Sequence, residues 1–416
     1  MTPATTTDIH RPGNAEQRAG GLPGPEPGLD HHPGLQARWL VSSHRQVRYE
    51  VRISDDAFDP ARLDVLECPD GTAGGGRRLV VLDRNVDRAH GRRIRDYLRH
   101  HGVAHRILLL DAHEAEKDFR SVARVVEAMD DFGLSRRSEP VLAVGGGVLT
   151  DVVGLATSLY RRGTPFVRVP TTLIGLVDAG VGAKTGINFN GGKNRLGTYA
   201  PAGLTLLDRS FLRSLDRRHI SNGLAEILKL ALIKDSALFD LLEHAGPSLL
   251  RERFQGATPE GDRVARAVLQ AATHAMLEEL QPNLWEDVLE RCVDYGHTFS
   301  PTIEMRGLPN LLHGEAVAVD MALTTVLAHQ RGLMTGSDRD RVLAVMAGLG
   351  LPSTDPSLDL ALLRDALHDT TLHRDGRQRM PLPVGIGGVT FVDDVTEREL
   401  RTALEVLRRL GAQRPR

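Results

Sequence analysis

The chain has 416 residues, a formal net charge of −2 and a pI near 6.8. This length is enough for two domains, and the balanced charge gives no reason to expect nucleic acid or a membrane as a partner. Cys68 and Cys292 form neither a disulfide framework nor a CxxC metal motif. No apolar run approaches the roughly 20 residues that span a bilayer, and the N-terminus lacks a signal-peptide pattern. We therefore expect a cytoplasmic protein.

The sequence before residue 38 has no pattern typical of a helix or strand. Residues 1–35 are rich in Pro, Gly, Thr and His without periodicity, so we expect a disordered tail. Apolar and polar residues alternate in residues 38–53, which predicts one or two strands.

Residues 78–83 (RLVVLD) predict a buried strand that ends at Asp83, with Asn85 two residues later. A carboxylate at the end of a parallel strand is the usual partner of ribose hydroxyls, although a turn-forming Asp fits this segment equally well. A helix over residues 86–101, a strand over 106–110, the polar residues Glu114 and Lys117, and another helix follow. This alternation predicts an α/β domain with a mainly parallel sheet.

A glycine turn follows the next predicted strand. Residues 141–144 are apolar and stop at Gly145, Gly146 and Gly147, and Asp151 lies in the first turn of the helix that follows. Such a turn lets backbone N–H groups approach a phosphate, and the helix N-terminus favours its negative charge.

Three polar clusters come after this turn, each beside glycines that allow sharp backbone turns. They contain Asp178, then Lys184, then Lys193 and Asn194. Two ammonium groups, a carboxylate and an amide on glycine-rich loops suit a small, polyhydroxylated, phosphorylated ligand.

After Asp208 long amphipathic patterns dominate and predict a second, helical domain. The expected helices cover residues 223–234, 237–244, 262–280, 285–295, 314–331, 338–348 and 396–410. We place the domains at residues 36–212 and 213–416, with the active site in the cleft between them.

The helical half contains a candidate metal site. Glu226 and Lys229 are three residues apart and share a helical face. His297 follows a glycine in DYGHTFSP, and His313 begins a predicted helix. One carboxylate and two imidazoles with open coordination positions match a catalytic Zn²⁺ site, but surface or core roles fit such scattered residues as well. The HExxH motif is absent.

Six motifs in a fixed order resemble those of a known protein family. They are GGGVLTD, RGTPFVRVPTTL, the spacing from Asp178 to Asn194, NGLAEILK, DYGHTF and HGEAVA. Together, over about residues 75–390, they resemble the sugar phosphate cyclases, the superfamily of dehydroquinate synthase. The resemblance implies an N-terminal NAD⁺-binding α/β domain, an all-α C-terminal metal-binding domain and a homodimer.

The resemblance also implies roles for individual residues. Glu226, His297 and His313 would bind Zn²⁺ or Co²⁺, and Lys184, Lys193, Asn194 and Lys229 would hold the substrate. Arg162 matches an arginine that reaches the phosphate from the neighbouring subunit. The residues implied to contact NAD⁺ are Asp83, Asn85, Glu114, Lys117, Gly146, Gly147, Asp151, Thr171, Thr172, Asp178 and Lys193.

Several positions depart from dehydroquinate synthase. Asp294 replaces an asparagine and Pro301 a second histidine, and His373 is the nearest polar residue to a lost DKK motif. The lysine and arginine that hold the substrate carboxylate align near Met276 and near Leu289 or Glu290. A buried carboxylate without a cation would cost several kcal/mol, so we expect a substrate without an acid group. For Asp294 and His373, substrate contact and core hydrogen bonding both fit.

These departures resemble the branch that cyclises sedoheptulose 7-phosphate, in particular the 2-epi-5-epi-valiolone-forming enzymes of bacterial aminocyclitol antibiotic pathways. The implied reaction is transient oxidation by NAD⁺, β-elimination of phosphate, re-reduction and intramolecular aldol closure. Other sedoheptulose 7-phosphate cyclases (forming 2-epi-valiolone or desmethyl-4-deoxygadusol), 3-dehydroquinate synthase and a metal-dependent alcohol or glycerol dehydrogenase remain alternatives.

Overall fold

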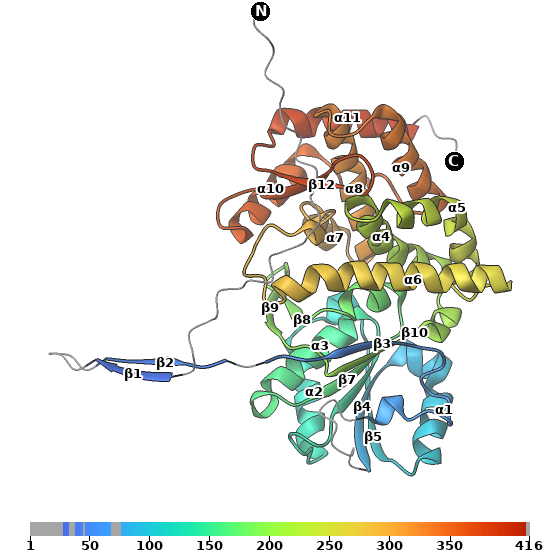
Figure 1. Cartoon of the computed structure of the whole chain (residues 1–416), viewed down its shortest axis with the longest axis vertical. Helices are drawn as coiled ribbons and strands as arrows, with labels where there is room; N and C mark the ends of the chain where they lie inside the picture. Colours follow the sequence, from blue (N-terminus) through green and yellow to red (C-terminus); the bar gives the residue numbers. More distant parts are fainter. Residues whose placement is uncertain (1–27, 33–37, 45, 68–75, 413–416) are drawn as a thin grey trace, which may run out of the picture. The chain divides into compact units, whose positions relative to one another are not determined.

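The computed structural model describes residues 28–32, 38–44, 46–67 and 76–412 (Figure 1). The chain divides into two compact units, Met1–Arg48 and Tyr49–Arg416. Cys68 and most of the predicted N-terminal tail lie outside the described residues.

The first unit contains a two-stranded antiparallel ribbon. Strand β1 (Gly28–His32) pairs with β2 (Arg38–Ser42), with His31 opposite Trp39. The prediction of a disordered tail is therefore wrong for residues 28–32. It relied on the lack of hydrophobic alternation, whereas backbone N–H and C=O groups pair in a ribbon whatever the side chains are.

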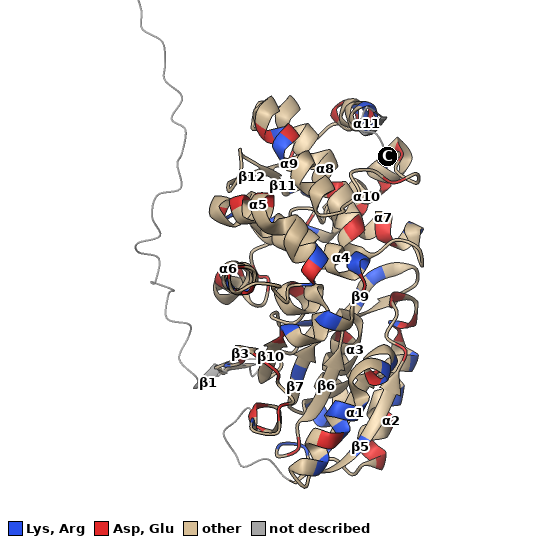
Figure 2. Ribbon diagram, turned by 90° about the vertical axis from the view of Figure 1, so that its right-hand side faces the viewer, with Lys and Arg blue, Asp and Glu red and all other residues tan. Residues whose placement is uncertain are grey.

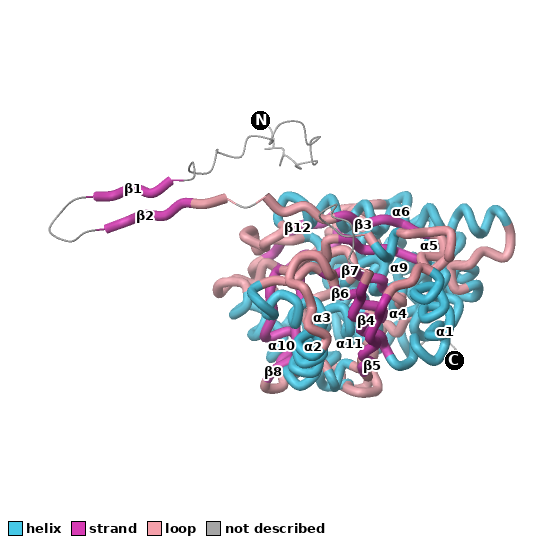
Figure 3. The backbone as a smooth tube through the Cα atoms, turned by 90° about the horizontal axis from the view of Figure 1, so that it is seen from below, coloured by secondary structure: helices cyan, strands magenta, loops and turns pink. Residues whose placement is uncertain are grey.

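The second unit begins with a six-stranded sheet whose neighbouring strands are all parallel (Figure 3). In spatial order its strands are β3 (Glu50–Ser54), β10 (Leu204–Asp208), β7 (Phe166–Pro170), β6 (Val141–Gly145), β4 (Arg77–Asp83) and β5 (Ala104–Leu110). The predicted α/β half with a parallel sheet is confirmed.

Helices cover both faces of this sheet because alternate strand residues point to opposite sides. Val80 and Leu82 pack in one apolar cluster with Tyr97 of α1 (Arg84–His100). Leu79 and Val81 pack in another, which includes residues of α2 (Phe119–Asp131) and α3 (Gly147–Leu159). The parallel arrangement brings the carboxyl ends of β4, β6 and β7 to one edge, where ligands bind in such folds.

The second half is helical apart from a small ribbon of β11 (Met380–Pro383) and β12 (Val389–Val392). Its helices are α4 (Arg217–Ile233), α5 (Ser236–Glu252), α6 (Pro259–Leu280), α7 (Ser300–Gly307), α8 (His313–Gln330), α9 (Gly336–Gly348), α10 (Leu360–His373) and α11 (Glu397–Ala412). Among the described residues, no helix combines the length and apolar character needed to cross a membrane.

The helix predicted over residues 285–295 is wrong. Only a short 3-10 helix, η7 (Cys292–Asp294), forms there. The Asn283 side chain donates to the carbonyl of Val288 (2.7 Å) and accepts from its N–H (3.0 Å), which closes a turn. Glu286 has a φ of 59°, which no right-handed helix accommodates.

An apolar core joins the two halves. Leu173 and Leu176, which follow β7, pack in the same cluster as Leu224 and Ile227 of α4. A Cβ on Gly223 would lie 2.4 Å from the Leu173 Cβ, so only glycine permits this approach. The predicted boundary at residues 212–213 falls inside the 3-10 helix η5 (Arg209–Ser214) and stays a prediction.

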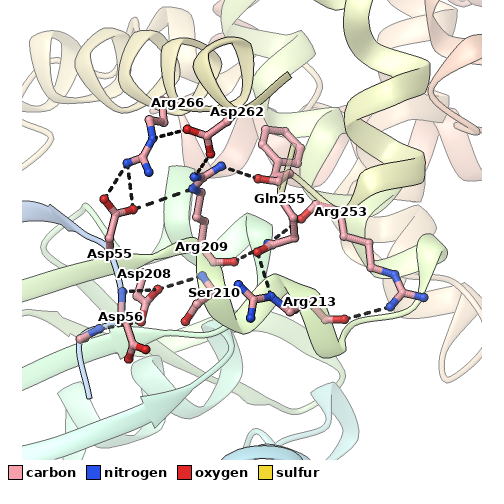
Figure 4. Close-up of polar contacts among 12 residues, drawn as sticks. Asp55, Asp56, Asp208, Arg209, Ser210, Arg213, Arg253, Gln255, Asp262 and Arg266 are labelled. Carbon is pink, nitrogen blue, oxygen red and sulfur yellow. Dashed lines mark hydrogen bonds and ion pairs between the residues drawn. The ribbon is translucent and has the colours of Figure 1, made fainter. Parts of the chain in front are cut away.

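Ion pairs reinforce this joint (Figure 4). Arg209 in η5 contacts Asp262 of α6 and donates to the carbonyl of Phe254 (2.8 Å). Arg266, one helical turn after Asp262, contacts Asp55 beyond β3 (2.7 Å). The segment after β3, η5 and α6 are thereby held together.

We expect Arg209→Met to lower the free energy of unfolding by about 1–3 kcal/mol, because Asp262 and the Phe254 carbonyl lose a largely buried charged donor. Thermal unfolding followed by circular dichroism measures the change. Arg263→Met, which removes an exposed pair with Glu260, should change stability by less than about 0.5 kcal/mol. Equal effects of the two substitutions would contradict the structural role of Arg209.

Candidate active site

A cavity of about 860 Å³ lies between the sheet edge and the helical half. The predicted site residues that line it are Asp83, Asn85, Glu114, Lys117, Gly146, Gly147, Asp151, Thr171, Thr172, Asp178, Lys184, Lys193, Asn194, Lys229, Asp294, His297 and His313. Glu226 is fully buried beside it. Charged residues occur on the segments around both α4 and β9 (Gly192–Tyr199) (Figure 2).

The three predicted metal ligands meet at one point. Ligand atoms of Glu226, His297 and His313 all lie within 4.8 Å of one another. Glu226 Oε1 is 3.4 Å from the Nε2 of His313 and 3.8 Å from that of His297, and it makes no hydrogen bond with the described residues. Atoms bound tetrahedrally to zinc are roughly 3.4 Å apart, so the set fits a divalent cation.

Both imidazoles are oriented through their other ring nitrogen. His297 Nδ1 lies 3.1 Å from the carbonyl of Tyr295, and His313 Nδ1 lies 2.8 Å from a carboxylate oxygen of Glu304. A carbonyl only accepts, so His297 must donate through Nδ1 and present the Nε2 lone pair. Partners of this kind fix the tautomer and orientation of metal-binding histidines.

The charges at this point favour a cation. Burial and the nearby Lys229 lower the pKa of His297 to about 3, so its ring is neutral at neutral pH. Burial opposes a charge on His313, but Glu304 and Glu226 outweigh it and raise its pKa to about 9. The carboxylates therefore stabilise positive charge there, which a metal ion can supply in exchange for the proton.

Close packing of α8 on α4 places His313 beside Glu226. A Cβ on Gly314 would lie 2.0 Å from the backbone oxygen of Asn222, so the helices approach this closely only at glycine. The Gly314 N–H donates a hydrogen bond to Asn222 Oδ1, with an N–O distance of 2.5 Å.

Asp320 of α8 holds the segment that carries His297. Its Oδ2 accepts from the backbone N–H groups of Phe299 (2.6 Å) and Ser300 (2.9 Å), at the beginning of α7. Asp320 is fully buried, and burial raises its pKa to about 6 even though these N–H groups lower it.

The opposite side of the cavity is built from the sheet edge. Gly146 precedes α3 and Gly147 begins it, so the N–H groups of this helix end face the cavity edge. A Cβ on Gly146 would lie 3.1 Å from Thr172, and one on Gly147 3.2 Å from Ala179. Asp83 Oδ1 accepts from the N–H of Asn85 (2.6 Å) and so caps α1. The two interpretations of Asp83 are therefore compatible, because the capping carboxylate also lines the cavity.

Polar side chains between the sheet edge and the helical half contact one another. Lys117 Nζ contacts Asp151 (2.6 Å) and donates to Asn194 (2.7 Å). Glu114 accepts from the side chain of Asn188 (2.8 Å). Lys117, which precedes α2, thus links Asp151 of α3 directly to Asn194 of β9.

Lys184, Lys193 and Asn194 lie on strands rather than on the expected glycine-rich loops. They belong to an antiparallel hairpin of β8 (Lys184–Phe189) and β9. The glycines in this stretch suggested loops, but the hairpin hydrogen bonds fix the backbone on both sides of its turn. Asp178 precedes the hairpin and lies 4.0 Å from Lys229 Nζ.

Four charged residues in or beside the cavity were not predicted from the sequence: Glu286, Arg291, Glu304 and Arg374. Glu304 on α7 contacts Lys193 and His313, and Pro301 near the beginning of that helix was the signal for it. Arg291 also lines the cavity and contacts Glu286 and Asp294. The expectation that no cation replaces the arginine near Leu289 or Glu290 is therefore wrong. Buried Arg374 lies 3.7 Å from Asp294.

Besides Glu226, two predicted residues are not among those that line the cavity. Arg162 is exposed after α3, with a φ of 63°. His373 is exposed at the end of α10. Their contact with substrate stays a prediction.

Comparison with known proteins identifies the family. The family models described as 3-dehydroquinate synthase N-terminal and 3-dehydroquinate synthase C-terminal match residues 107–222 and 223–371. The chain belongs to the 3-dehydroquinate synthase family.

Several members of this family are similar over nearly the whole chain. A 2-epi-5-epi-valiolone synthase of Streptomyces albus is 63% identical over 92% of this chain and 93% of its own length. Another from Actinoplanes sp. is 64% identical over 92% of this chain and 96% of its own length. The solved structure of ValA, a 2-epi-5-epi-valiolone synthase of Streptomyces hygroscopicus subsp. jinggangensis with NAD⁺ and Zn²⁺ bound, is 54% identical. It matches with a TM-score of 0.85 over 89% of this chain and 100% of its own.

We expect Glu304→Gln to weaken Zn²⁺ binding about 10- to 100-fold, because His313 loses the carboxylate that orients it and increases its basicity. Competition with a chromophoric chelator measures the dissociation constant. The control is Asp365→Asn. Asp365 of α10 is exposed and pairs with Arg306, which lies on the same helix as Glu304. Unchanged zinc affinity in Glu304→Gln would contradict this role.

We expect the free energy of unfolding to depend on pH because of Asp320. Its folded pKa of about 6 lies above the ordinary value of 3.8, so protonation favours the folded state below pH 3.8 and this contribution is lost as pH rises through about 6. Asp320→Asn cannot titrate and keeps an oxygen acceptor. Its stability relative to the parent protein should therefore rise by about 2 kcal/mol between pH 4 and pH 7. Urea unfolding of chelator-treated protein tests this, and a pH-independent difference would contradict it.

Proposed function

We propose that this protein converts sedoheptulose 7-phosphate into 2-epi-5-epi-valiolone and inorganic phosphate. The observation that carries the proposal is a single cavity that joins the Glu226, His297 and His313 cluster to the glycine turn before α3. The high identity to 2-epi-5-epi-valiolone synthases over nearly the whole chain supports this product.

The residues on the two sides of the cavity fit the two cofactors. Glu226, His297 and His313 would hold Zn²⁺ or Co²⁺. The α3 N-terminus with Gly146 and Gly147 would hold the pyrophosphate of NAD⁺, and Asp83 a ribose. When bound, NAD⁺ supplies a reversible hydride acceptor and the metal a Lewis acid for the reacting oxygen.

The chain's other residues would bind and orient the sugar. Lys184, Lys193 and Asn194 face the cavity from the β8–β9 hairpin and would grip phosphate and hydroxyl groups. Lys229, held 2.5 Å from Glu226 and 4.0 Å from Asp178, would stabilise negative charge on an oxygen near the metal ligands. Asp294 would orient hydroxyl groups. His373 would contact the substrate, because its pKa, which partial desolvation lowers, is also affected by the cavity residues Asp294 and Lys184.

We also infer a homodimer, in which Arg162 reaches the phosphate in the neighbouring subunit. The exposed left-handed segment that presents Arg162 outside its own cavity supports this. A cytoplasmic location and a role in aminocyclitol antibiotic biosynthesis agree with the paucity of cysteine and with the named relatives.

The test is incubation with sedoheptulose 7-phosphate, NAD⁺ and Zn²⁺, with products identified by NMR. We expect phosphate release without net accumulation of NADH, because the same cofactor is oxidised and reduced in each turnover. Glu226→Gln should abolish both zinc binding and phosphate release, since a neutral amide is a poor zinc ligand.

Each rival function has its own outcome in this experiment. Net NADH formation from an alcohol, without phosphate release, would indicate a dehydrogenase. Turnover of the seven-carbon acid phosphate used by 3-dehydroquinate synthase, with none of sedoheptulose 7-phosphate, would indicate that enzyme. A different epimer or a deoxygadusol in the NMR spectrum would keep the substrate and correct the product.

A further inference from the structure

Each lysine and arginine that lines the cavity contacts a carboxylate. Lys117 pairs with Asp151, Lys193 with Glu304, and Lys229 with Glu226. Lys184 pairs with Glu286, and Arg291 pairs with both Glu286 and Asp294. A phosphate group that binds to one of these cations must therefore share it with a carboxylate or displace that carboxylate.

Glu286 differs from the other carboxylates in its backbone setting. Asp151, Glu226 and Glu304 lie within α-helices, where hydrogen bonds fix the backbone, and Asp294 lies in the 3-10 helix η7. Glu286 lies in residues 284–291, which form neither helix nor strand, and its φ of 59° is one that non-glycine residues rarely adopt. Such backbone conformations persist where surrounding contacts impose them and cluster at functional sites.

The contacts that impose this conformation come from the β8–β9 hairpin and from the cavity cations. The Tyr199 hydroxyl donates 3.1 Å to Glu286 Oε2. The Trp285 ring stands edge-on to the Tyr199 ring, with centroids 5.7 Å apart. Glu286 Oε1 meets Lys184 and Arg291, so one carboxylate oxygen faces both cations while the other is held by the hairpin.

We infer that Glu286 is an internal anion that competes for Lys184 and Arg291 with the phosphate group of the substrate and with the inorganic phosphate that is released. The inference rests on the proposed function for the identity of the sugar. The competition for phosphate itself does not depend on which sugar carries it. Two anions beside one ammonium group repel each other, so phosphate gains these cations when the Glu286 side chain turns away. Arg291 keeps Asp294 as a partner in either arrangement.

This competition affects every ligand that brings a negative charge to Lys184. It weakens the binding of the released phosphate as much as that of the substrate phosphate, and so favours release of the product. It also disfavours a second anionic group at this end of the cavity, because Glu286 and Asp294 already balance the charge of Lys184 and Arg291.

The experiment is calorimetric titration of the NAD⁺- and Zn²⁺-loaded protein with inorganic phosphate at constant ionic strength. Glu286→Gln keeps the shape of the side chain and removes its charge, and we expect it to tighten phosphate binding on the order of fivefold. Tyr199→Phe removes only the hydrogen bond to Oε2, and should shift the affinity in the same direction by less.

Asp287→Asn is the matched control, because it removes the same charge from an exposed neighbour on the same segment. We expect it to leave phosphate affinity unchanged. Unchanged or weaker phosphate binding by Glu286→Gln would overturn the inference, and so would an equal gain in affinity in Asp287→Asn. Failure of phosphate to bind both the parent protein and Glu286→Gln would also overturn it. Comparable melting temperatures verify that the variants fold.

The outcome is separable from that of the proposed function, because the titration contains no sugar. If sedoheptulose 7-phosphate is not turned over but Glu286→Gln still binds phosphate more tightly, only the proposed substrate fails. If the sugar is cyclised and phosphate affinity does not respond, only the role of Glu286 fails. When both hold, the KM for the sugar phosphate should fall by a similar factor.

Discussion

The structure of the site depends on a carboxylate that has no access to solvent. Glu226 is fully buried in α4, and a buried carboxylate costs several kcal/mol unless positive charge compensates it. Lys229 supplies one such charge from the next turn of the same helix. The other oxygen faces two imidazoles from different segments. Because these imidazoles come from the segment between η7 and α7 and from the beginning of α8, compensation of one charge ties both segments to α4.

The same constraint extends to the α/β half. Lys229 lies between Glu226 and Asp178, and Asp178 follows the segment that packs against Gly223 of α4. Lys193 of the β8–β9 hairpin reaches Glu304, which also contacts His313. Charged pairs thus connect the cluster of Glu226, His297 and His313 with the hairpin that carries Lys184 and Lys193. The distance between the two cofactor sides is therefore set by buried ion pairs as well as by apolar packing.

The sequence predicted the features that have a local pattern. The parallel sheet and the turn at Gly146 follow from short apolar runs that end in glycine or Asp. Because Glu226, His297 and His313 are scattered and their meeting is set by helix packing, the residue types gave a metal site only as one of several interpretations, and the family resemblance favoured it. The false helix over residues 285–295 arose because its apolar spacing resembles a helix, whereas Asn283 closes a turn there. Helix α7 is only eight residues long, too short for a periodic signal, so Glu304 was missed.

The position of Arg291 changes the physical basis of the expected selectivity. The sequence suggested that an acid group on the substrate is excluded because its cations are lost. The structure instead keeps a cation in the cavity and surrounds it with Glu286 and Asp294. A guanidinium flanked by two carboxylates has little remaining attraction for a further anion, and it holds those carboxylates in place. In the proposed function, exclusion of an acid group would therefore follow from the anions around Arg291 rather than from the absence of a positive charge.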